Sequence, residues 1–215
     1  MYRGLQDDEE FAESVTELDR DPRVDLSLVA AVALLKLAGV RQAPHSRLDG
    51  PLRSVHVAPL LQAVVLLDSQ LSKTPNEVPL RLLLVQLHLL LGCASYAYQL
   101  WIPMDVKRTI QDALSPLFFD RLSSLSPGLF HGDRRPLMEP LRSYYSSSLK
   151  DRAPVKIWDA FAAGSYSAIL DMVEYMDRLR RSCTLVMTAV EERRATRAIG
   201  GKLDSGIDEL PMLCE

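Results

Sequence analysis

The chain has 215 residues, of which 47% are hydrophobic and 25% are charged. This composition is typical of a folded globular protein and excludes an intrinsically disordered one. The formal net charge of −3 provides no overall attraction to nucleic acid, so we expect no direct contact with DNA or RNA.

Three cysteines, Cys93, Cys183 and Cys214, lie far apart in the chain and form no C-x-x-C pair. Their odd number and wide spacing fit neither a disulfide framework nor a zinc site, and they favour a reducing compartment. The first residues are acidic and lack the charged-then-apolar pattern of a secretion signal. We therefore expect a cytoplasmic protein.

The first elements in chain order are an acidic segment and two helices. Residues 1–22 predict a polar arm or a short helix. A strong helix is predicted from Asp25 to Ala38, with Asp25 or Ser27 as its N-cap and Gly39 as its C-cap. After a proline-containing loop, the next helix is predicted from Pro59 to Lys73, because proline suits the first turn of a helix.

The most apolar run of the chain, LRLLLVQLHLLLGCASYAY, extends from Leu80 to Tyr98. A membrane span needs about 20 consecutive apolar residues with few charges. Arg81, Gln86 and His88 interrupt this run, and Gly92 ends the first helix within it. The pattern predicts a helix buried between neighbouring helices, and no membrane contact is expected.

The remaining sequence also predicts helices and contains no convincing strand pattern. Asp105 is expected to cap a helix that Pro116 kinks or splits. A long final helix is expected to break near residues 180–182, and residues 200–215 are expected to be loose. The predicted helical segments are 95–102, 106–125, 134–150, 153–164 and 165–199. The fold class is therefore predicted to be all-α.

Three glycines, Gly92, Gly128 and Gly164, recur every 36 residues, each between a helix and a shorter helical segment. A small residue at the corner of two antiparallel helices, with an aromatic residue after it, is typical of a tetratricopeptide repeat, whose period is about 34 residues. These glycines predict repeat corners in an α-solenoid of tetratricopeptide-like antiparallel helix pairs over residues 23–199. Residues 1–22 and 200–215 would flank this solenoid.

Motifs of catalysis are lacking in the sequence. It contains neither a P-loop nor a G-x-S-x-G turn. Arg197 and Gly200 partly match an acetyl-CoA-binding turn, but Lys202 occupies its last small position and the glycines follow a helix. We predict no catalytic residue, metal site or cofactor. The four histidines have no metal-ligand spacing; they are His45, His56, His88 and His131.

Lys107 and Arg108 begin a predicted helix, where positive charge opposes the helix dipole. We interpret these two residues as candidates to face a partner protein.

Two segments of the chain resemble a known family. MDVKRTIQDAL, Met104 to Leu114, is similar to a segment L-D-V-K-H-I-Q-H-D-T-L of that family and keeps its Asp-Val-Lys core and Asp112. Thr109 and Ile110 depart from the pattern. The later run AFAAGSYSAILDMVEYMDRLRRSCTLVMTAVEERR resembles a helix pair with a Gly-x-Tyr/Phe corner and an Arg-Leu-x-x-Ser segment. The family is the auxiliary, non-catalytic subunit of the N-terminal acetyltransferase B (NatB) complex.

The resemblance covers about Leu60 to Leu213, and because family members are much longer, the chain looks like a fragment from the middle of one. It implies a scaffold that holds the catalytic NatB subunit, docks it to the ribosome and has no chemistry of its own. Two alternatives stay open: a general helical-repeat adaptor with another partner, and an all-α enzyme. Because a solenoid depends on neighbouring repeats, we expect the chain alone to be marginally stable and aggregation-prone.

Overall fold

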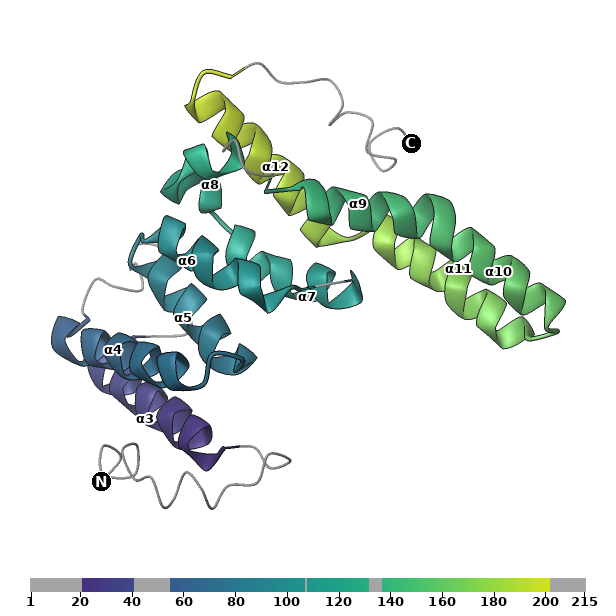
Figure 1. Cartoon of the computed structure of the whole chain (residues 1–215). Helices are drawn as coiled ribbons and strands as arrows, with labels where there is room; N and C mark the ends of the chain where they lie inside the picture. Colours follow the sequence, from purple (N-terminus) through teal and green to yellow (C-terminus); the bar gives the residue numbers. More distant parts are fainter. Residues whose placement is uncertain (1–20, 41–54, 107, 132–136, 202–215) are drawn as a thin grey trace. The chain divides into compact units, whose positions relative to one another are not determined.

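The computed structural model describes residues 21–40, 55–106, 108–131 and 137–201. All regular elements among these residues are helical (Figure 1), which confirms the all-α prediction. The chain divides into two compact units, residues 1–88 and 89–215.

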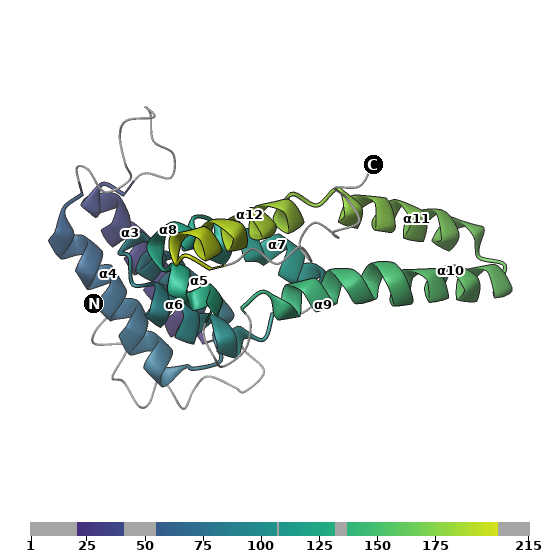
Figure 2. The ribbon, with the colours of Figure 1, turned by 90° about the horizontal axis from the view of Figure 1, so that it is seen from above.

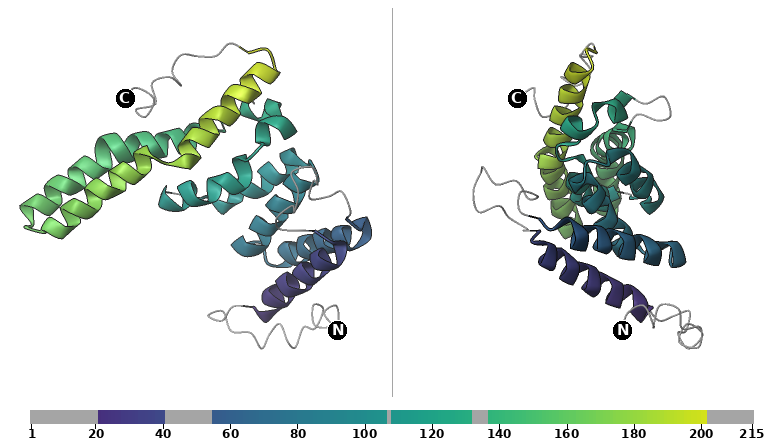
Figure 3. Two further views of the ribbon diagram at one scale, coloured as in Figure 1. Left: turned by 180° about the vertical axis from the view of Figure 1, so that it is seen from behind. Right: turned by 90° about the vertical axis from the view of Figure 1, so that its left-hand side faces the viewer.

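The first unit is built on an antiparallel helix pair, α3 (Pro22–Ala38) and α4 (Val57–Lys73). The two helices lie side by side in every view (Figure 3). A hydrogen bond of 2.8 Å from the His56 N–H to the Ala38 carbonyl places the start of α4 beside the end of α3. Ala31 of α3 and Ala63 of α4 are fully buried, and such small side chains let two helices approach closely.

The end of α3 was predicted correctly, but its beginning was not. Gly39 has the predicted left-handed conformation, with φ 80°. The N-cap is Asp21, whose carboxylate accepts a 2.9 Å bond from the Arg23 N–H, and neither Asp25 nor Ser27 serves as the cap. Pro22 explains the difference, because its fixed φ suits the first helical position and lets the helix start earlier.

The apolar run forms two helices, α5 (Val78–Leu90) and α6 (Ala94–Trp101). Leu80 and Leu84 of α5 are fully buried. Burial lowers the pKa of the His88 imidazole, and the negative charge of Asp68 opposes this shift. In the described part of the chain, none of the helices has the length and apolarity needed to cross a bilayer.

An aromatic cluster forms part of the core of the second unit, where α6 meets α7 (Arg108–Phe119). The Phe118 ring is fully buried and stacks on Trp101, with 5.1 Å between ring centroids. Tyr98 and Phe119 contact the same ring, at centroid distances of 6.2 and 5.2 Å. Full burial of one phenylalanine is worth about 1.5–3 kcal/mol.

Two predicted helix boundaries are corrected around α7. Asp105 has φ 45° and ends the short 3-10 helix η1 (Ile102–Met104), and α7 begins only at Arg108. Pro116 lies inside α7 and does not split it. The chain turns at Arg121, with φ 59°, immediately before α8 (Leu122–Leu125).

A long helical hairpin follows, made of residues 139–180. Its first leg runs without interruption through α9 (Glu139–Ser147), a π-helical turn η3 (Ser148–Arg152) and α10 (Ala153–Ala162). The second leg, α11 (Tyr166–Arg180), returns alongside the first (Figure 2). Gly164 makes the turn with φ 68°, a conformation that favours glycine.

The final helix, α12 (Cys183–Ala198), begins directly after α11. The predicted break near residues 180–182 is confirmed. Ser182 is the N-cap, and its hydroxyl accepts a 3.4 Å hydrogen bond from the Leu185 N–H. α12 packs against α7, α8 and the 3-10 helix η2 (Pro127–His131).

The three evenly spaced glycines differ in conformation. Gly92, between α5 and α6, and Gly164, between α10 and α11, have positive φ values of 79° and 68°. Gly128 lies inside η2, and its φ is outside the left-handed range. The proposed flanking segments fall almost wholly in 1–20 and 202–215, outside the described residues.

Candidate functional site

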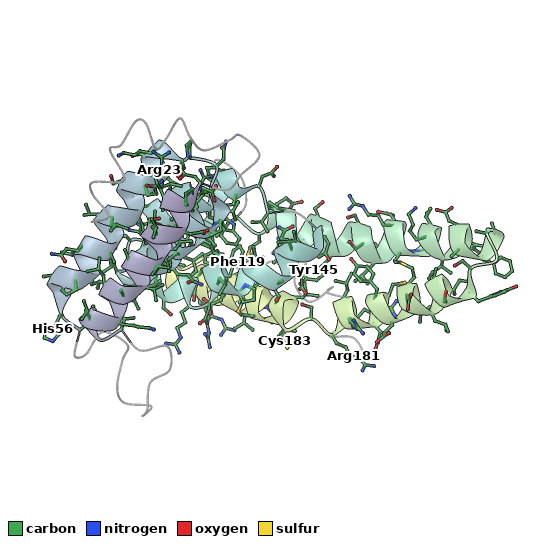
Figure 4. All side chains as sticks on the ribbon, turned by 90° about the horizontal axis from the view of Figure 1, so that it is seen from below. Arg23, His56, Phe119, Tyr145, Arg181 and Cys183 are labelled. Atoms are coloured by element: carbon green, nitrogen blue, oxygen red, sulfur yellow. The ribbon has the colours of Figure 1, made fainter. Side chains whose placement is uncertain are left out.

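Three oxygen-bearing side chains meet at the base of the hairpin: Asp112 from α7, Tyr145 from α9 and Ser182 at the start of α12. The Ser182 hydroxyl donates a 2.6 Å hydrogen bond to Asp112 Oδ1, and the Tyr145 hydroxyl donates to the same oxygen. The Tyr145 and Ser182 oxygens lie 2.9 Å apart. We refer to these three residues as the Asp112 cluster; Tyr145 and the residues flanking Ser182, Arg181 and Cys183, are labelled in Figure 4.

A proline in α7 explains a further bond to Asp112. Pro116 has no N–H, so the carbonyl four residues earlier, that of Asp112, receives no hydrogen bond from it. The Thr184 hydroxyl on α12 donates a 2.9 Å hydrogen bond to this carbonyl. The start of α12 thus supplies the donor that the proline removes from α7.

Two adjacent tyrosines of α9 stay protonated well above neutral pH. Burial raises the pKa of Tyr145, and its hydrogen bond to the Asp112 carboxylate raises it further. Burial also raises the pKa of Tyr144, whose hydroxyl lies 3.1 Å from that of Tyr175 on α11. Both hydroxyls are therefore neutral hydrogen-bonding groups at the base of the hairpin.

The middle of α12 is attached by two carboxylates. Glu191 is buried and accepts a 2.9 Å hydrogen bond from the Ser123 N–H in the first turn of α8. Its other oxygen accepts a 3.1 Å bond from Arg194. The neighbouring Glu192 forms an ion pair with Arg142 on α9. These bonds position α12 against both α8 and α9.

Away from its base, the hairpin exposes large apolar side chains. Trp158 on α10 is 71% exposed and Leu170 on α11 is 72% exposed. The Trp158 and Phe161 rings contact each other, with 6.1 Å between centroids. We refer to six exposed side chains together as the apolar face: Val155, Trp158 and Phe161 of α10, and Tyr166, Leu170 and Val173 of α11.

Helix geometry places these side chains on one side of the hairpin. The less exposed residues of each leg, such as Ile157 and Met172, mark the flank where α10 and α11 meet. At 3.6 residues per turn, Trp158 and Val173 each lie about a quarter-turn from that flank. Because the two helices are antiparallel, equal rotations point to the same side, so the apolar face is continuous across both legs.

Charged residues along the hairpin form exposed ion pairs within each leg. Lys156 and Asp159 on α10 form an ion pair of 3.3 Å, and Asp177 and Arg181 form one of 3.2 Å. Such exposed pairs contribute about 0–1 kcal/mol to stability.

Of the two predicted partner-facing residues, the structure describes only the backbone of Arg108. Lys107 lies outside the described residues, and Arg108 is the first residue of α7, with its side chain also outside them. Sequence reasoning missed the apolar face. The periodicity of Val155, Trp158 and Phe161 was a signal for it, but it cannot distinguish an exposed face from a buried one. Among the described residues, no group of three or more potential metal ligands comes together.

Comparison with known proteins identifies the family. Residues 3–211 match the family described as the non-catalytic subunit of the N-acetyltransferase B complex (NatB). The chain belongs to this family. Over 143 residues it is 28% identical to the N-terminal acetyltransferase B complex subunit MDM20 of Saccharomyces cerevisiae, a match that covers 66% of this chain. No solved structure matches the chain.

The match covers only 18% of the length of the yeast subunit, so the family of the non-catalytic NatB subunit includes much longer proteins. Two residues of the Asp112 cluster come from the segments that carry the resemblance. Asp112 lies in the segment Met104 to Leu114, and Ser182 ends the Arg-Leu-x-x-Ser segment. The fold brings these two segments together through the hydrogen bond from Ser182 to Asp112.

Proposed function

We propose that this chain acts as a non-catalytic scaffold in a NatB complex and holds the catalytic acetyltransferase subunit. The observation that carries the proposal is the family match over residues 3–211. A scaffold of this kind contributes shape and surface, and acetyl transfer with its acetyl-CoA belongs to the catalytic subunit. We therefore assign no catalytic residue, metal or cofactor to this chain.

The architecture that we propose is an α-solenoid of tetratricopeptide-like helix pairs over residues 23–199. Two antiparallel pairs support it, α3 with α4 and α10 with α11. Gly92, Gly128 and Gly164 remain the proposed repeat corners, and the segments before and after the solenoid remain flanking segments. Stacked helix pairs suit a scaffold because each pair leaves one side open for a neighbour or a partner.

The apolar face is the surface that we propose for contact with the catalytic subunit. Exposed Trp and Tyr side chains, such as Trp158 and Tyr166, are enriched among residues that dominate binding energy. A continuous exposed apolar patch is also a recognised mark of a protein interface. Lys107 and Arg108 remain proposed partner-facing residues as well.

The place of action that we propose is the cytoplasm, at the ribosome, where the complex would meet nascent chains. Family membership supports this proposal only through the complex, so ribosome association needs its own test. Sedimentation of the assembled complex with ribosomes, compared with the chain alone, provides that test.

Co-expression with the catalytic NatB subunit tests the central proposal. The tagged chain should retain the catalytic subunit through purification. The double variant Trp158→Ser and Leu170→Ser should weaken this association at least about tenfold, because residues that dominate an interface contribute about 2 kcal/mol or more each.

The matched control is Val29→Ser with Val65→Ser, which removes two exposed apolar side chains from the first unit, 68% and 66% exposed. This control should bind like the parent chain. Failure of the parent chain to retain the catalytic subunit would reject the scaffold proposal and favour a helical adaptor for another partner. Equal weakening by both double variants would reject the apolar face as the contact surface.

A further inference from the structure

The outer part of the hairpin receives its main support from within the hairpin. In the described part of the chain, the principal contacts of α10 are with α11 and η3, and those of α11 are with α10 and η3. α9, at the base, packs against α7 as well as η3. The direction in which the hairpin extends is therefore decided at its base.

The Asp112 cluster occupies this base and reaches both legs. Tyr145 belongs to α9, the start of the first leg, and Ser182 follows the end of the second leg after one intervening residue. Asp112 Oδ1 accepts hydrogen bonds from both hydroxyls. The Asp112 carboxylate of α7 thus bonds to the base of both legs, and the Arg142–Glu192 ion pair also attaches α9 to α12.

We propose that the Asp112 carboxylate fixes the direction of the hairpin relative to α7 and α8. It thereby also fixes the direction of the apolar face. The proposal is independent of the identity of the partner protein. It assigns Asp112 a positioning role in presenting the face and no contact with the partner.

The arrangement of the hydroxyl oxygens predicts what happens when the Asp112 carboxylate is removed. The Tyr145 and Ser182 oxygens lie 2.9 Å apart in the parent chain, so without the carboxylate these two hydroxyls should pair with each other. The Tyr144 and Tyr175 hydroxyls also remain in contact across the legs. The hairpin should therefore stay closed while its attachment to α7 is loosened. This outcome distinguishes a residue that positions the hairpin from one that holds its two legs together.

Distances between spin labels in the 215-residue chain test this proposal. One label pair joins Ser124 on α8 to Ser167 near the tip of α11, and a second pair joins Lys156 to Asp171 across the two legs; all four positions are exposed. The three native cysteines are first replaced with serine.

The parent chain should give one narrow distance distribution for each label pair. In Asp112→Ala, the α8-to-tip pair should lose its narrow peak, while the pair across the legs keeps it. Tyr175→Phe is the matched control: it removes one hydroxyl of the hairpin without touching Asp112, and both distributions should stay narrow.

An unchanged α8-to-tip distribution in a folded Asp112→Ala chain would overturn the proposal. So would loss of both narrow distributions together, since that marks an opened hairpin. If Asp112→Ala loses its helical circular dichroism, Tyr145→Phe decides the question. It removes the donor of the first leg to the carboxylate and keeps the Ser182 cap of α12, and it should broaden the α8-to-tip distribution alone.

The scaffold proposal can fail separately from this one. Loss of catalytic-subunit binding in the apolar-face variant concerns the contact, whereas the label distances concern the free chain. If both proposals hold, Asp112→Ala should also weaken retention of the catalytic subunit, although Asp112 lies outside the apolar face.

Discussion

The Ser182 hydroxyl lies 2.6 Å from the Asp112 carboxylate, although 70 residues separate the two in the chain. The same hydroxyl caps α12 by accepting a hydrogen bond from the Leu185 N–H. Ser182→Ala removes both interactions, and the loss of a cap together with a bond to a charged group should lower the free energy of unfolding by about 2–3 kcal/mol. Urea denaturation followed by circular dichroism measures the change.

Ser165→Ala is the control for this prediction. Ser165 occupies the equivalent position before α11, is exposed and makes no side-chain hydrogen bond to the helix. Its substitution should change stability by less than about 0.5 kcal/mol. Equal losses in the two variants would show that the Asp112 bond adds nothing.

The hydrogen bond from Thr184 to the Asp112 carbonyl should be coupled to Pro116. Thr184→Val leaves that carbonyl without its donor and should cost about 1–3 kcal/mol. In a Pro116→Ala background the new N–H can bond to the carbonyl, so the same Thr184→Val change should cost less. A double-mutant cycle measured by urea denaturation gives the coupling energy, and additive effects would contradict the explanation.

The evenly spaced glycines should respond differently to alanine. An added Cβ at Gly164 would meet no atom within 4 Å, so the cost arises from its φ of 68° alone. Gly164→Ala should therefore destabilise the chain by about 1–2 kcal/mol. Gly128 has equal space and no positive φ, so Gly128→Ala should be within about 0.5 kcal/mol of the parent in thermal or urea unfolding. Equal costs would contradict this account.

Tyr145 should make the folded chain sensitive to high pH. Its pKa is raised above the ordinary value of 10.0, so the unfolded chain loses this proton first as pH rises. The stabilisation is complete below about pH 10 and is lost at higher pH. Tyr145→Phe should flatten the fall in unfolding free energy above pH 10, measured by urea denaturation across that range. Tyr166→Phe, at an exposed position, is the control and should leave the slope as in the parent.

The two tryptophans should report separately on the core and the apolar face. Trp101→Phe leaves Trp158, which is 71% exposed and should be quenched strongly by acrylamide. Trp158→Phe leaves Trp101, which stacks on Phe118 and should be quenched more weakly. Addition of the catalytic subunit should protect Trp158 and leave Trp101 unchanged. Strong quenching of Trp158 in the assembled complex would place the contact elsewhere.

Local sequence patterns predicted the helices well but located some of their ends wrongly. Gly39 was predictable because a left-handed C-cap depends on a single residue. The effect of Pro116 was not, because the helix continues through the proline, and Thr184, 72 residues after Asp112, bonds to the Asp112 carbonyl. The turn occurs instead at Arg121, a residue with no local preference for φ 59°.

Local sequence patterns were also insufficient to predict the candidate site. Asp112 and Ser182 both stood in segments that resemble the family, yet their separation of 70 residues concealed their hydrogen bond. On the hairpin, the period of Val155 and Trp158 correctly predicts one apolar side of a helix. Whether that side is covered depends on the neighbouring elements, which a local pattern does not contain.

The bond between Glu191 and the start of α8 has a consequence for the order of events during synthesis. The Ser123 N–H obtains its buried acceptor from a residue that is translated 68 positions later. The packing around α8 is therefore complete only after α12 has been synthesised. Contacts between such distant residues also form slowly. While the hairpin is being translated, the Ser123 N–H therefore lacks the acceptor that α12 later provides.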